Sequence, residues 1–443
     1  MVDLKRTQLK VRAERAALVQ VEDPRASNGR FDSLEELNRL ARTAGAKVVT
    51  RLKQKRNNPD PHSYLGSGKV NELGRICKTR NVDVVICDDD LSPAQFKNLE
   101  NSLDTKVIDR TELILDIFAT HARTRQAKLQ VELAQLEYAY PRLKRMWTHL
   151  DRKAGGTVGG ADGGGGIGVR GPGEKQLEVD RQLVQKNIHR LKKKLEEIEK
   201  RRQLQVEDRN ERFPSVSLVG YTNAGKSSLL NGLTEGDVSV KDQLFETLDT
   251  RTRRWELPDS REVMLSDTVG FIRKLPHHLV ACFHATLEEA READLMLHVI
   301  DAGSDDVQGD MRAVNNVLEE IGCGDIPVLP VLNKIDLLEN PQRIPLEKEL
   351  PDHVAVSAET GEGLDELTGR IQDFLDELHA DVYVEAGVGN GKLHSFLHES
   401  GAVLNADYNG SEVTFRVKLP EHLTGVIEKM GGAVTRARGD STA

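Results

Sequence analysis

The stretch Gly220-Tyr-Thr-Asn-Ala-Gly-Lys-Ser227 decides the fold of the central part of this chain. A short apolar run, Ser215 to Val219, precedes it, and apolar residues through Leu233 follow it, so the pattern predicts a strand, a loop and a helix in that order. Glycines in such a loop let backbone N–H groups converge on phosphate oxygens, and the helix N-terminus adds partial positive charge. We therefore expect a phosphate-binding loop, in which the Lys226 ammonium reaches the terminal phosphates and the Ser227 hydroxyl binds Mg²⁺.

A second stretch, Asn333-Lys-Ile-Asp336, directly follows the apolar run Val328 to Leu332. It would lie at the carboxyl end of a strand, where open α/β sheets bind ligands. The Asp336 carboxylate can accept both the N1–H and the exocyclic amine of guanine, a pair of donors that adenine does not present. A buried carboxylate left unpaired is costly, so Asp336 predicts selection of GTP over ATP. Ser357 and Ala358, after another apolar run, would complete the base pocket through backbone N–H groups.

Two segments between these stretches carry candidates for binding Mg²⁺ and the γ-phosphate. Asp267-Thr-Val-Gly270 closes a predicted strand; its carboxylate can hold Mg²⁺ through water, and the Gly270 N–H can meet the γ-phosphate. Upstream, Phe245-Glu-Thr-Leu-Asp249 can offer the Thr247 hydroxyl to Mg²⁺ once the γ-phosphate orders the segment. The expected Mg²⁺ ligands are Ser227, Thr247 and, through water, Asp267, and the expected catalytic residues are Lys226, Thr247 and Gly270.

Together these motifs define one expected GTP site within residues 213–380, where strands and helices alternate as in an α/β domain with a largely parallel sheet. The residues expected to contact GTP are Gly220, Tyr221, Thr222, Asn223, Ala224, Gly225, Lys226, Ser227, Phe245, Glu246, Thr247, Leu248, Asp249, Asp267, Thr268, Val269, Gly270, Asn333, Lys334, Ile335, Asp336, Ser357, Ala358 and Glu359.

Charge is distributed unevenly along the 443 residues, a length that corresponds to about three domains. The whole chain holds 62 Lys and Arg against 71 Asp and Glu, and its net charge of −9 argues against a nucleic-acid binder. Residues 121–212, however, hold 21 Lys and Arg against 13 Asp and Glu, an excess of +8 that leaves −17 for the rest. The location of the positive charge therefore matters more than the net charge.

The basic segment is predicted to be a long antiparallel helical hairpin, residues 111–212, kinked near Pro141. Apolar residues recur at helical spacing on both sides of a loop, 155–173, in which 11 of 19 residues are glycine. A solvated coiled-coil spacer would show the same periodicity, but a spacer does not require a basic bias. The seam residues are Leu129, Leu133, Leu136, Tyr140, Leu143 and Trp147 before the loop, and Val184, Ile188, Leu191, Leu195 and Ile198 after it.

A small domain is predicted on each side of this core. Residues 1–110 alternate apolar runs with amphipathic segments, which indicates an α/β domain with a capping box at Ser33 and Glu36 opening one helix. Gly66-Ser-Gly-Lys69 lacks the spacing of a phosphate loop, and an ordinary loop is the simpler interpretation. Residues 381–443 form a small α+β domain, in which Asn409-Gly410 predicts a hairpin turn. The expected fold class is thus multidomain α/β.

Cysteine usage and hydropathy favour a soluble cytoplasmic protein. The four cysteines lie far apart and form no metal-ligand spacing, which is typical of a reducing compartment. No stretch approaches the ~18 apolar residues of a spanning helix, and the start lacks the apolar core of a secretion signal. The cysteines are Cys77, Cys87, Cys282 and Cys323.

The motifs, read together, resemble those of the HflX family, in the Obg-HflX group of translation-factor-related P-loop GTPases. The resemblance is carried by the phosphate loop, by Phe245-Glu-Thr-Leu-Asp with Arg251 to Arg254, and by Asp267-Thr-Val-Gly-Phe-Ile-Arg-Lys-Leu-Pro-His277. Upstream, Gly166-Ile-Gly-Val-Arg-Gly-Pro-Gly-Glu174 and Leu177-Glu-Val-Asp-Arg181 also match. The resemblance covers nearly the whole chain and is most specific over residues 166–336.

The resemblance implies a GTPase that hydrolyses GTP to GDP and phosphate, binds the large ribosomal subunit and separates stalled or idle ribosomes, notably under heat or other stress. The hairpin loop would reach ribosomal RNA near the peptidyl transferase centre, with Arg170, Lys192, Lys193 and Lys194 as candidate contacts. Neutralised phosphates supply most non-specific RNA affinity, and the basic hairpin fits that role. The protein would be ribosome-associated and monomeric, with no stable membrane insertion; relatives have also been credited with a weak ATP-related activity in the N-terminal domain.

Two alternatives stay open at the level of sequence. The chain could be a GTPase that acts on another RNA or on a ribosome-assembly intermediate, or a nucleotide-gated adaptor that binds a protein through its coiled coil. Salt distinguishes them, because RNA binding weakens steeply with ionic strength and coiled-coil pairing less so.

One position bears on the rate of hydrolysis. Ras-like GTPases carry a water-orienting Gln directly after Asp-x-x-Gly, whereas this chain has Phe271, which cannot orient a nucleophile. Slow hydrolysis by the isolated protein is therefore expected, with activation by the ribosome or by K⁺ held at Asn223, as potassium-activated relatives in this class imply. A role for Asn223 as a backbone cap is the simpler alternative. Glu359 stands where many GTPases have Lys, which removes a side chain that stacks near the base.

Overall fold

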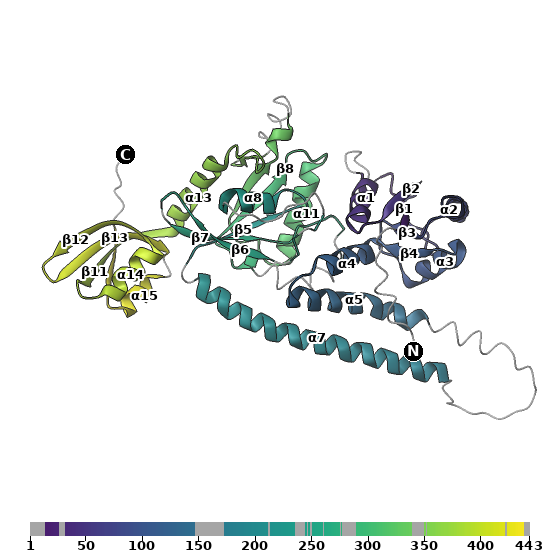
Figure 1. The fold of residues 1–443 in the computed structure, drawn as a ribbon, viewed down its shortest axis with the longest axis horizontal. Helices are drawn as coiled ribbons and strands as arrows, with labels where there is room; N and C mark the ends of the chain where they lie inside the picture. Colours follow the sequence, from purple (N-terminus) through teal and green to yellow (C-terminus); the bar gives the residue numbers. More distant parts are fainter. Residues whose placement is uncertain are drawn as a thin grey trace, which may run out of the picture. The chain divides into compact units, whose positions relative to one another are not determined.

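The computed structural model describes residues 14–25, 32–146, 172–210, 213–234, 244–245, 247–248, 250–259, 261–274, 276, 289–338, 350, 352–420 and 423–437. Figure 1 labels the helices and strands, and the chain divides into two compact units. The first unit holds Met1–Glu199, Asp242–Asp249 and Arg273–His284, and the second holds Lys200–Lys241, Thr250–Ile272 and Ala285–Ala443. Two short segments from the central part of the sequence therefore belong to the first unit.

The first unit is built on a four-stranded parallel sheet with strand order β2-β1-β3-β4. Parallel sheets need cover on both faces. Helices α2 and α3 pack together over a core that includes Val19, Leu73 and Leu99, and α1 and α4 pack together against the strands as well. The elements are β1 (Arg15–Glu22), α1 (Ser33–Thr43), β2 (Lys47–Lys55), α2 (Ser67–Arg80), β3 (Val84–Cys87), α3 (Pro93–Leu103), β4 (Lys106–Asp109) and α4 (Arg110–His121).

The start of α1 differs from the sequence prediction. The N-cap is Asp32, whose carboxylate accepts from the Leu34 N–H, so the predicted capping box at Ser33 and Glu36 is wrong. Both side chains have other partners: the Ser33 hydroxyl donates to Asp88 over 2.6 Å, and the Glu36 carboxylate binds Arg110. Tertiary contacts have overridden the local capping pattern. The Gly66–Lys69 stretch is the beginning of α2, with Gly66 as N-cap.

Helix α5 (Arg125–Met146) packs against α3 and α4. Its Arg142 guanidinium donates to Asp109 over 2.7 Å and to Glu112 over 3.2 Å, and lies over the Tyr138 ring. Because α4 begins at Arg110 and its apolar face is buried, the predicted domain boundary at residue 110 falls at the first residue of this packed helix.

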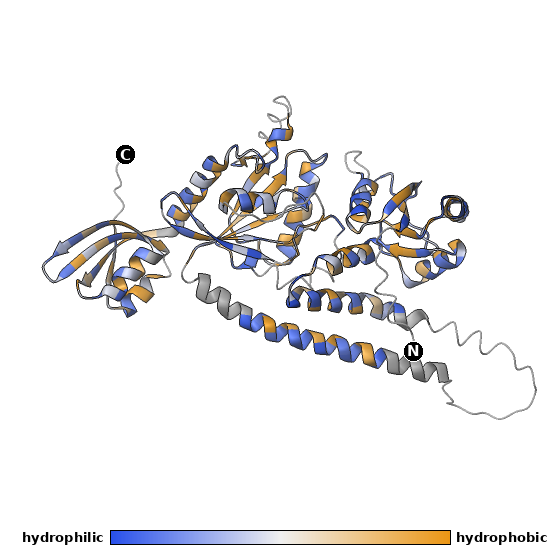
Figure 2. Ribbon diagram, in the orientation of Figure 1, coloured by the Kyte–Doolittle hydropathy of each residue, from blue (hydrophilic) through white to orange (hydrophobic). Residues whose placement is uncertain are grey.

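The second helix of the predicted hairpin is α7 (Pro172–Asn210), so the predicted loop 155–173 ends before Pro172, and residues 147–171 lie outside the described part. Lys192 pairs with Glu137 over 2.7 Å, and Arg181 donates to the Tyr140 hydroxyl over 2.9 Å, which places α7 beside α5. Apolar and polar residues alternate along α7 in Figure 2. Of the predicted seam, Leu133, Val184 and Leu191 are buried.

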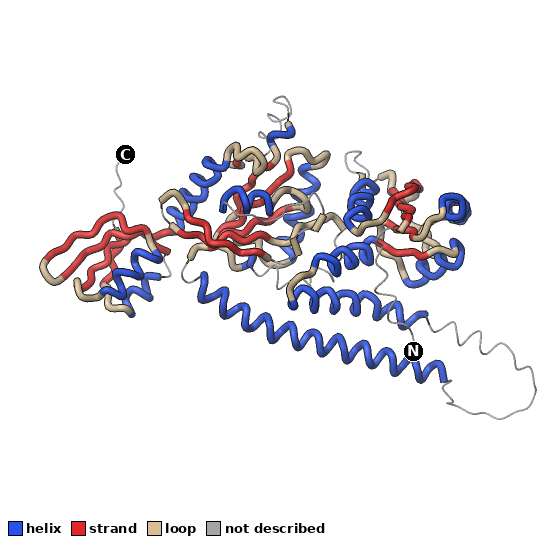
Figure 3. Tube along the Cα trace, viewed as in Figure 1, coloured by secondary structure: helices blue, strands red, loops and turns tan. Residues whose placement is uncertain are grey.

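The second unit contains a six-stranded sheet with order β10-β9-β8-β5-β7-β6, parallel except for β6 at one edge. Its apolar core joins β5, β7, β8 and β9 to α8 and α13, and this largely parallel α/β sheet confirms the P-loop GTPase fold (Figure 3). The elements are β5 (Ser215–Gly220), α8 (Lys226–Thr234), β6 (Arg251–Glu256), β7 (Glu262–Asp267), β8 (Leu295–Asp301), α11 (Val307–Glu320), β9 (Val328–Asn333), η2 (Ile335–Leu337), β10 (Val354–Ala355) and α13 (Leu364–Leu378).

The C-terminal part of the second unit forms an antiparallel sheet with order β12-β13-β11-β14. Helices α14 and α15 share a core with one face of this sheet. Strand β11 starts at His379, so the predicted boundary at residue 381 falls inside it. The elements are β11 (His379–Gly387), α14 (Gly391–Ser400), β12 (Ala402–Asn409), β13 (Glu412–Pro420), α15 (Thr424–Lys429) and β14 (Ala433–Arg436). Among the described residues, no helix combines the length and the apolar character needed to span a bilayer.

Candidate nucleotide-binding site

The phosphate loop connects β5 to α8 and is packed tightly against two neighbouring strands. Gly220 has φ +153°, and a Cβ there would lie 2.3 Å from the Val299 carbonyl oxygen of β8. Gly225 has φ +94°, and a Cβ there would lie 2.2 Å from the Asn333 amide nitrogen at the end of β9. Both positions therefore require glycine, because a side chain would meet strand residues as well as strain the backbone.

Lys226, the first residue of α8, is buried beneath this loop. Its Nζ donates to the Tyr221 carbonyl over 2.8 Å and to the Gly220 carbonyl over 3.1 Å. Burial lowers the pKa of Lys226 to about 8, although the nearby Asp267 carboxylate raises it. The ammonium is thus held by neutral carbonyl groups, an arrangement that favours an incoming anion.

Ser227 and Asp267 form a compact pair of oxygen donors. The Ser227 hydroxyl donates to Asp267 Oδ2 over 2.6 Å, and the Asp267 carboxyl group is fully buried at the end of β7. Next to it, the Thr268 hydroxyl donates to the Leu218 carbonyl of β5 over 2.7 Å, which fixes the chain after β7. Hydroxyl and carboxylate oxygens are the ligands that Mg²⁺ prefers, so the donor chemistry of this pair fits that ion.

The chain continues from Asp267 to lie directly against the phosphate loop. A Cβ at Gly270 would lie 2.8 Å from Thr222 Cα and 3.0 Å from Lys226 Nζ. Phe271 pairs with the loop in both directions: its carbonyl accepts from the Thr222 N–H over 2.7 Å, and its N–H donates to Gly220 over 3.1 Å. Gly270 is therefore held close to the ammonium that would bind the terminal phosphates. The Phe271 side chain is buried.

The base-reading stretch is tied to the same loop. Asn333 donates from its side chain to the Ala224 carbonyl over 2.8 Å and accepts from the Ala358 N–H over 3.0 Å. Lys334 Nζ donates to the Asn223 carbonyl over 2.7 Å. Asp336 accepts from the Ser357 hydroxyl over 2.6 Å. The phosphate loop, Asn333–Asp336 and Ser357–Ala358 thus form one continuous network, while the Glu359 side chain next to it is exposed.

Two residues of this network were absent from the sequence prediction. Asp301 pairs with Lys334 Nζ over 2.7 Å, and it is the last residue of β8, so its position at the carboxyl end of a buried strand was an available signal. His298 is buried in β8; burial and the Lys226 charge lower its pKa to about 4, so it is neutral at pH 7. A single histidine inside an apolar run gives no such signal.

Some predicted residues fall within the first unit, and others lie outside the described part of the chain. Phe245, Thr247 and Leu248 are buried, and they belong to the first unit rather than to the unit of the phosphate loop. Glu246, Asp249 and Arg170 lie outside the described residues. Of the candidate RNA contacts on α7, Lys192 is engaged by Glu137, whereas Lys193 and Lys194 are exposed.

Three protein-family models match the chain in succession. Residues 31–119 match a model described as GTP-binding GTPase N-terminal, and residues 121–209 match the GTP-binding GTPase middle region. Residues 215–334 match a model described as 50S ribosome-binding GTPase, and this range includes the phosphate loop and Asn333.

Curated relatives match over nearly the full length. The GTPase HflX of Lacrimispora saccharolytica is 42% identical over 94% of this chain and 96% of the relative. The chain belongs to the HflX GTPase family. The HflX of Escherichia coli is 45% identical over 88% of this chain and 90% of the relative. This HflX-family chain is accordingly a GTPase.

A solved structure is also similar to the chain. A GTP-binding protein from Sulfolobus solfataricus, crystallised in complex with GDP, is 27% identical over 82% of this chain and 98% of that protein, with a TM-score of 0.43.

Proposed function

We propose that this HflX-family GTPase binds the large ribosomal subunit and separates stalled or idle ribosomes into subunits, notably under heat or other stress. The observation that carries the proposal is the match of residues 215–334 to a GTPase model described as 50S ribosome-binding. GTP occupancy would control association, and hydrolysis to GDP and phosphate would release the protein. The protein would be cytoplasmic, associated with ribosomes, and would act as a monomer.

The charge of the hairpin supports ribosomal RNA as the surface it contacts. Residues 121–212 carry an excess of +8 in a chain of net charge −9. Lys193 and Lys194 are exposed on α7, and we propose that they, with Lys192 and Arg170, contact RNA near the peptidyl transferase centre. Lys192 would exchange its Glu137 partner for phosphate, because both it and the carboxylate are reached by solvent.

In hydrolysis, the side chains of the site would position charge rather than form covalent bonds. Lys226 would hold the terminal phosphates, the Gly270 N–H would meet the γ-phosphate, and Thr247 would join once the nucleotide orders its segment. Mg²⁺, held by Ser227 and Thr247 and through water by Asp267, would neutralise developing phosphate charge. Because Phe271 is apolar and buried, it cannot orient the attacking water, and the isolated protein should hydrolyse GTP slowly.

We propose K⁺ as a second cofactor at Asn223. This residue has φ +63°, and its carbonyl accepts from Lys334, so its backbone is fixed while its side chain belongs to the phosphate loop. Exchange of KCl for NaCl at constant ionic strength should slow single-turnover hydrolysis, and Asn223→Ala should remove that difference. An equal rate in both salts would exclude a role for K⁺.

Ribosome sedimentation tests the proposed function. With a non-hydrolysable GTP analogue the protein should co-sediment with large subunits and convert 70S particles to subunits, whereas with GDP it should remain in the supernatant. Co-sedimentation that is independent of the nucleotide would contradict the proposal.

A matched pair of variants tests the hairpin. Lys193→Glu with Lys194→Glu should abolish co-sedimentation and reduce its dependence on salt, because each lost phosphate contact lowers the salt slope by about one unit. Lys53→Glu with Lys69→Glu, at one exposed and one partly exposed position of the first unit, provides a control of equal charge change. A binding that is insensitive to salt would instead favour a coiled-coil adaptor.

A further inference from the structure

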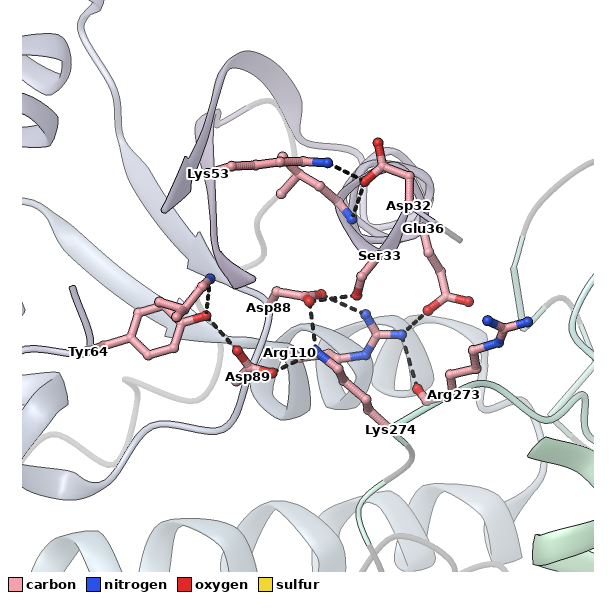
Figure 4. A network of polar contacts seen from close by, with 12 residues as sticks. Asp32, Ser33, Glu36, Lys53, Tyr64, Asp88, Asp89, Arg110, Arg273 and Lys274 are labelled. Atoms are coloured by element: carbon pink, nitrogen blue, oxygen red, sulfur yellow. Dashed lines mark hydrogen bonds and ion pairs between the residues drawn. The ribbon is translucent and has the colours of Figure 1, made fainter. Parts of the chain in front are cut away.

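A buried ion network lies at the carboxyl edge of the sheet in the first unit (Figure 4). Asp88 directly follows β3, and Arg110, the first residue of α4, directly follows β4. Since the carboxyl ends of parallel strands lie at one edge of a sheet, the two residues meet there. The Arg110 guanidinium is 1% exposed; it donates to Asp88 Oδ1 over 2.9 Å and also binds the Glu36 carboxylate. It also donates to the backbone carbonyl of Arg273 over 3.1 Å.

Lys274, the residue after Arg273, is attached to the same edge. Its Nζ donates to Asp88 Oδ2 over 2.8 Å and to Asp89 Oδ1 over 2.6 Å. The second oxygen of Asp89 accepts from the Tyr64 hydroxyl over 2.7 Å, so the carboxylate is held in place from the other side. Burial alone would lower the pKa of Lys274, but the two carboxylates outweigh it and raise that pKa. The lysine is therefore charged throughout the physiological range.

Lys274 adds a second cation to a network that is rich in carboxylates. Asp88 is fully buried and binds both Arg110, which also binds Glu36, and Lys274, which also binds Asp89. Removing one partner from a buried ion group is costly, since the remaining charge loses its compensation. Lys274 supplies the second cation, and docking of Arg273 and Lys274 thus stabilises the first unit.

The other short segment of the first unit is held independently. The Leu244 N–H donates to the Thr43 hydroxyl over 3.3 Å, and the Phe245 ring packs edge-on against Phe118 with centroids 4.8 Å apart. Thr43 ends α1 and Phe118 lies in α4. The segment before Thr247 is therefore secured to α1 and α4, and the segment after Gly270 is secured to α4 and the edge of this sheet.

We propose that Asp88 and Asp89 are positioning residues for GTP hydrolysis, acting through Lys274 to fix the chain that follows Gly270. Only Phe271, Ile272 and Arg273 separate Gly270 from this anchor, and each residue spans at most ~3.6 Å. Phe271 and Ile272 are buried, and the Phe271 backbone is hydrogen-bonded to the phosphate loop, so the stretch of chain from Gly270 to Lys274 is itself held in place. This inference rests on the proposed contact of Gly270 with the γ-phosphate, and it is independent of ribosome binding.

A mutant cycle in the full chain tests the proposal without ribosomes. Asp89→Asn and Lys274→Gln should each slow single-turnover GTP hydrolysis roughly 3- to 10-fold, and the double variant should be no slower than either one, because both remove the same contact. Affinity for a non-hydrolysable GTP analogue should fall, while affinity for GDP, which has no γ-phosphate, should not change. If the contact were merely structural, its loss would change the affinities for the analogue and for GDP by the same factor.

The matched control is Lys53→Gln, which removes another lysine–aspartate contact of 2.8 Å, to Asp32, in the same unit. It should not change hydrolysis. Additive effects in the cycle, an equal loss of analogue and GDP affinity, or faster hydrolysis in the single variants would each overturn the proposal. Because every readout uses the isolated protein, failure of ribosome splitting would leave this result unaffected, and the reverse also holds.

Discussion

Lys226, in the phosphate loop, and Lys274, four residues after Gly270 in the sequence, have opposite surroundings. Lys226 in the phosphate loop is buried and held by the carbonyls of Gly220 and Tyr221, and its pKa is lowered to about 8. Lys274 in the first unit is exposed and bonded to the carboxylates of Asp88 and Asp89, and its pKa is raised. The hydrogen bonds of Lys226 go to neutral carbonyls, with the Asp267 carboxylate nearby, whereas Lys274 is bonded directly to two carboxylates.

The difference separates a ligand-binding charge from a structural one. A buried cation among neutral carbonyls gains most from an anion that arrives later, so Lys226 is suited to bind phosphates. A cation already paired with two carboxylates gains little from a further anion, so Lys274 is suited to hold the chain in place. The variants below test this distinction, from the largest expected effect to the smallest.

Arg110→Gln should cause the largest loss of stability, about 3–5 kcal/mol, because it removes a buried cation that binds the carboxylates of both Asp88 and Glu36. Hydrogen exchange at the β3 and α4 amides, in the full chain, would measure it. Arg51→Gln removes an exposed pair with Glu35 and should cost less than about 1 kcal/mol. Similar small losses in both variants would mean that the buried network is not what stabilises this edge.

Lys226→Ala should weaken GTP and GDP binding by at least roughly 100-fold, or about 3 kcal/mol, since it removes a buried cation from the phosphates. Fluorescent-nucleotide titration would measure both affinities. Lys53→Gln should leave both unchanged, because this lysine is exposed and belongs to the other unit. A loss below about tenfold would contradict the role assigned to Lys226.

Asp336→Asn should shift base preference from guanosine to xanthosine nucleotides, with a loss of roughly 100-fold in GTP affinity. Like Asp88, Asp336 accepts from a serine hydroxyl over 2.6 Å, but Asp88 also binds two cations. We propose that the Asp336 carboxylate uses its remaining capacity to accept hydrogen bonds for guanine. Competition between GTP and XTP would measure the shift, and unchanged GTP affinity would show that another group reads the base.

The nucleotide site and the Asp88 network also differ in how much of each could be predicted from the sequence. The phosphate loop and the Asn333–Asp336 stretch are short contiguous patterns after apolar strands, so their positions in the fold follow from local chemistry. The Asp88 network joins residues 36, 88, 110 and 273, which have no common spacing, and only the parallel order of the strands brings them together. Ser33 and Glu36 even formed a plausible local capping pattern, which their tertiary partners replaced.

The assignment of residues 244–248 shows the same limit. Their sequence motif predicts a nucleotide contact, but the contacts that place Leu244 and Phe245 come from Thr43 and Phe118, far away in the chain. Apolar packing between distant segments produces no periodic sequence pattern in either segment. Motifs therefore predicted the chemistry of this segment, and tertiary packing decided which unit holds it.

The effects of the two lysines should also differ in their dependence on pH. Because Lys226 has a pKa of about 8, nucleotide binding above pH 8 must take up a proton, and affinity should fall up to tenfold per pH unit there. Lys226→Arg keeps its charge, so the fall should disappear and any titration of the nucleotide itself should remain visible. Lys274 has a raised pKa, so its contribution to stability is present below the unfolded value of 10.5 and should stay constant from pH 7 to about 9.5. The difference in unfolding free energy between wild type and Lys274→Gln should therefore stay constant over that range while nucleotide affinity declines. If this difference fell together with the affinity, both lysines would titrate in the same range, and their surroundings would not distinguish them.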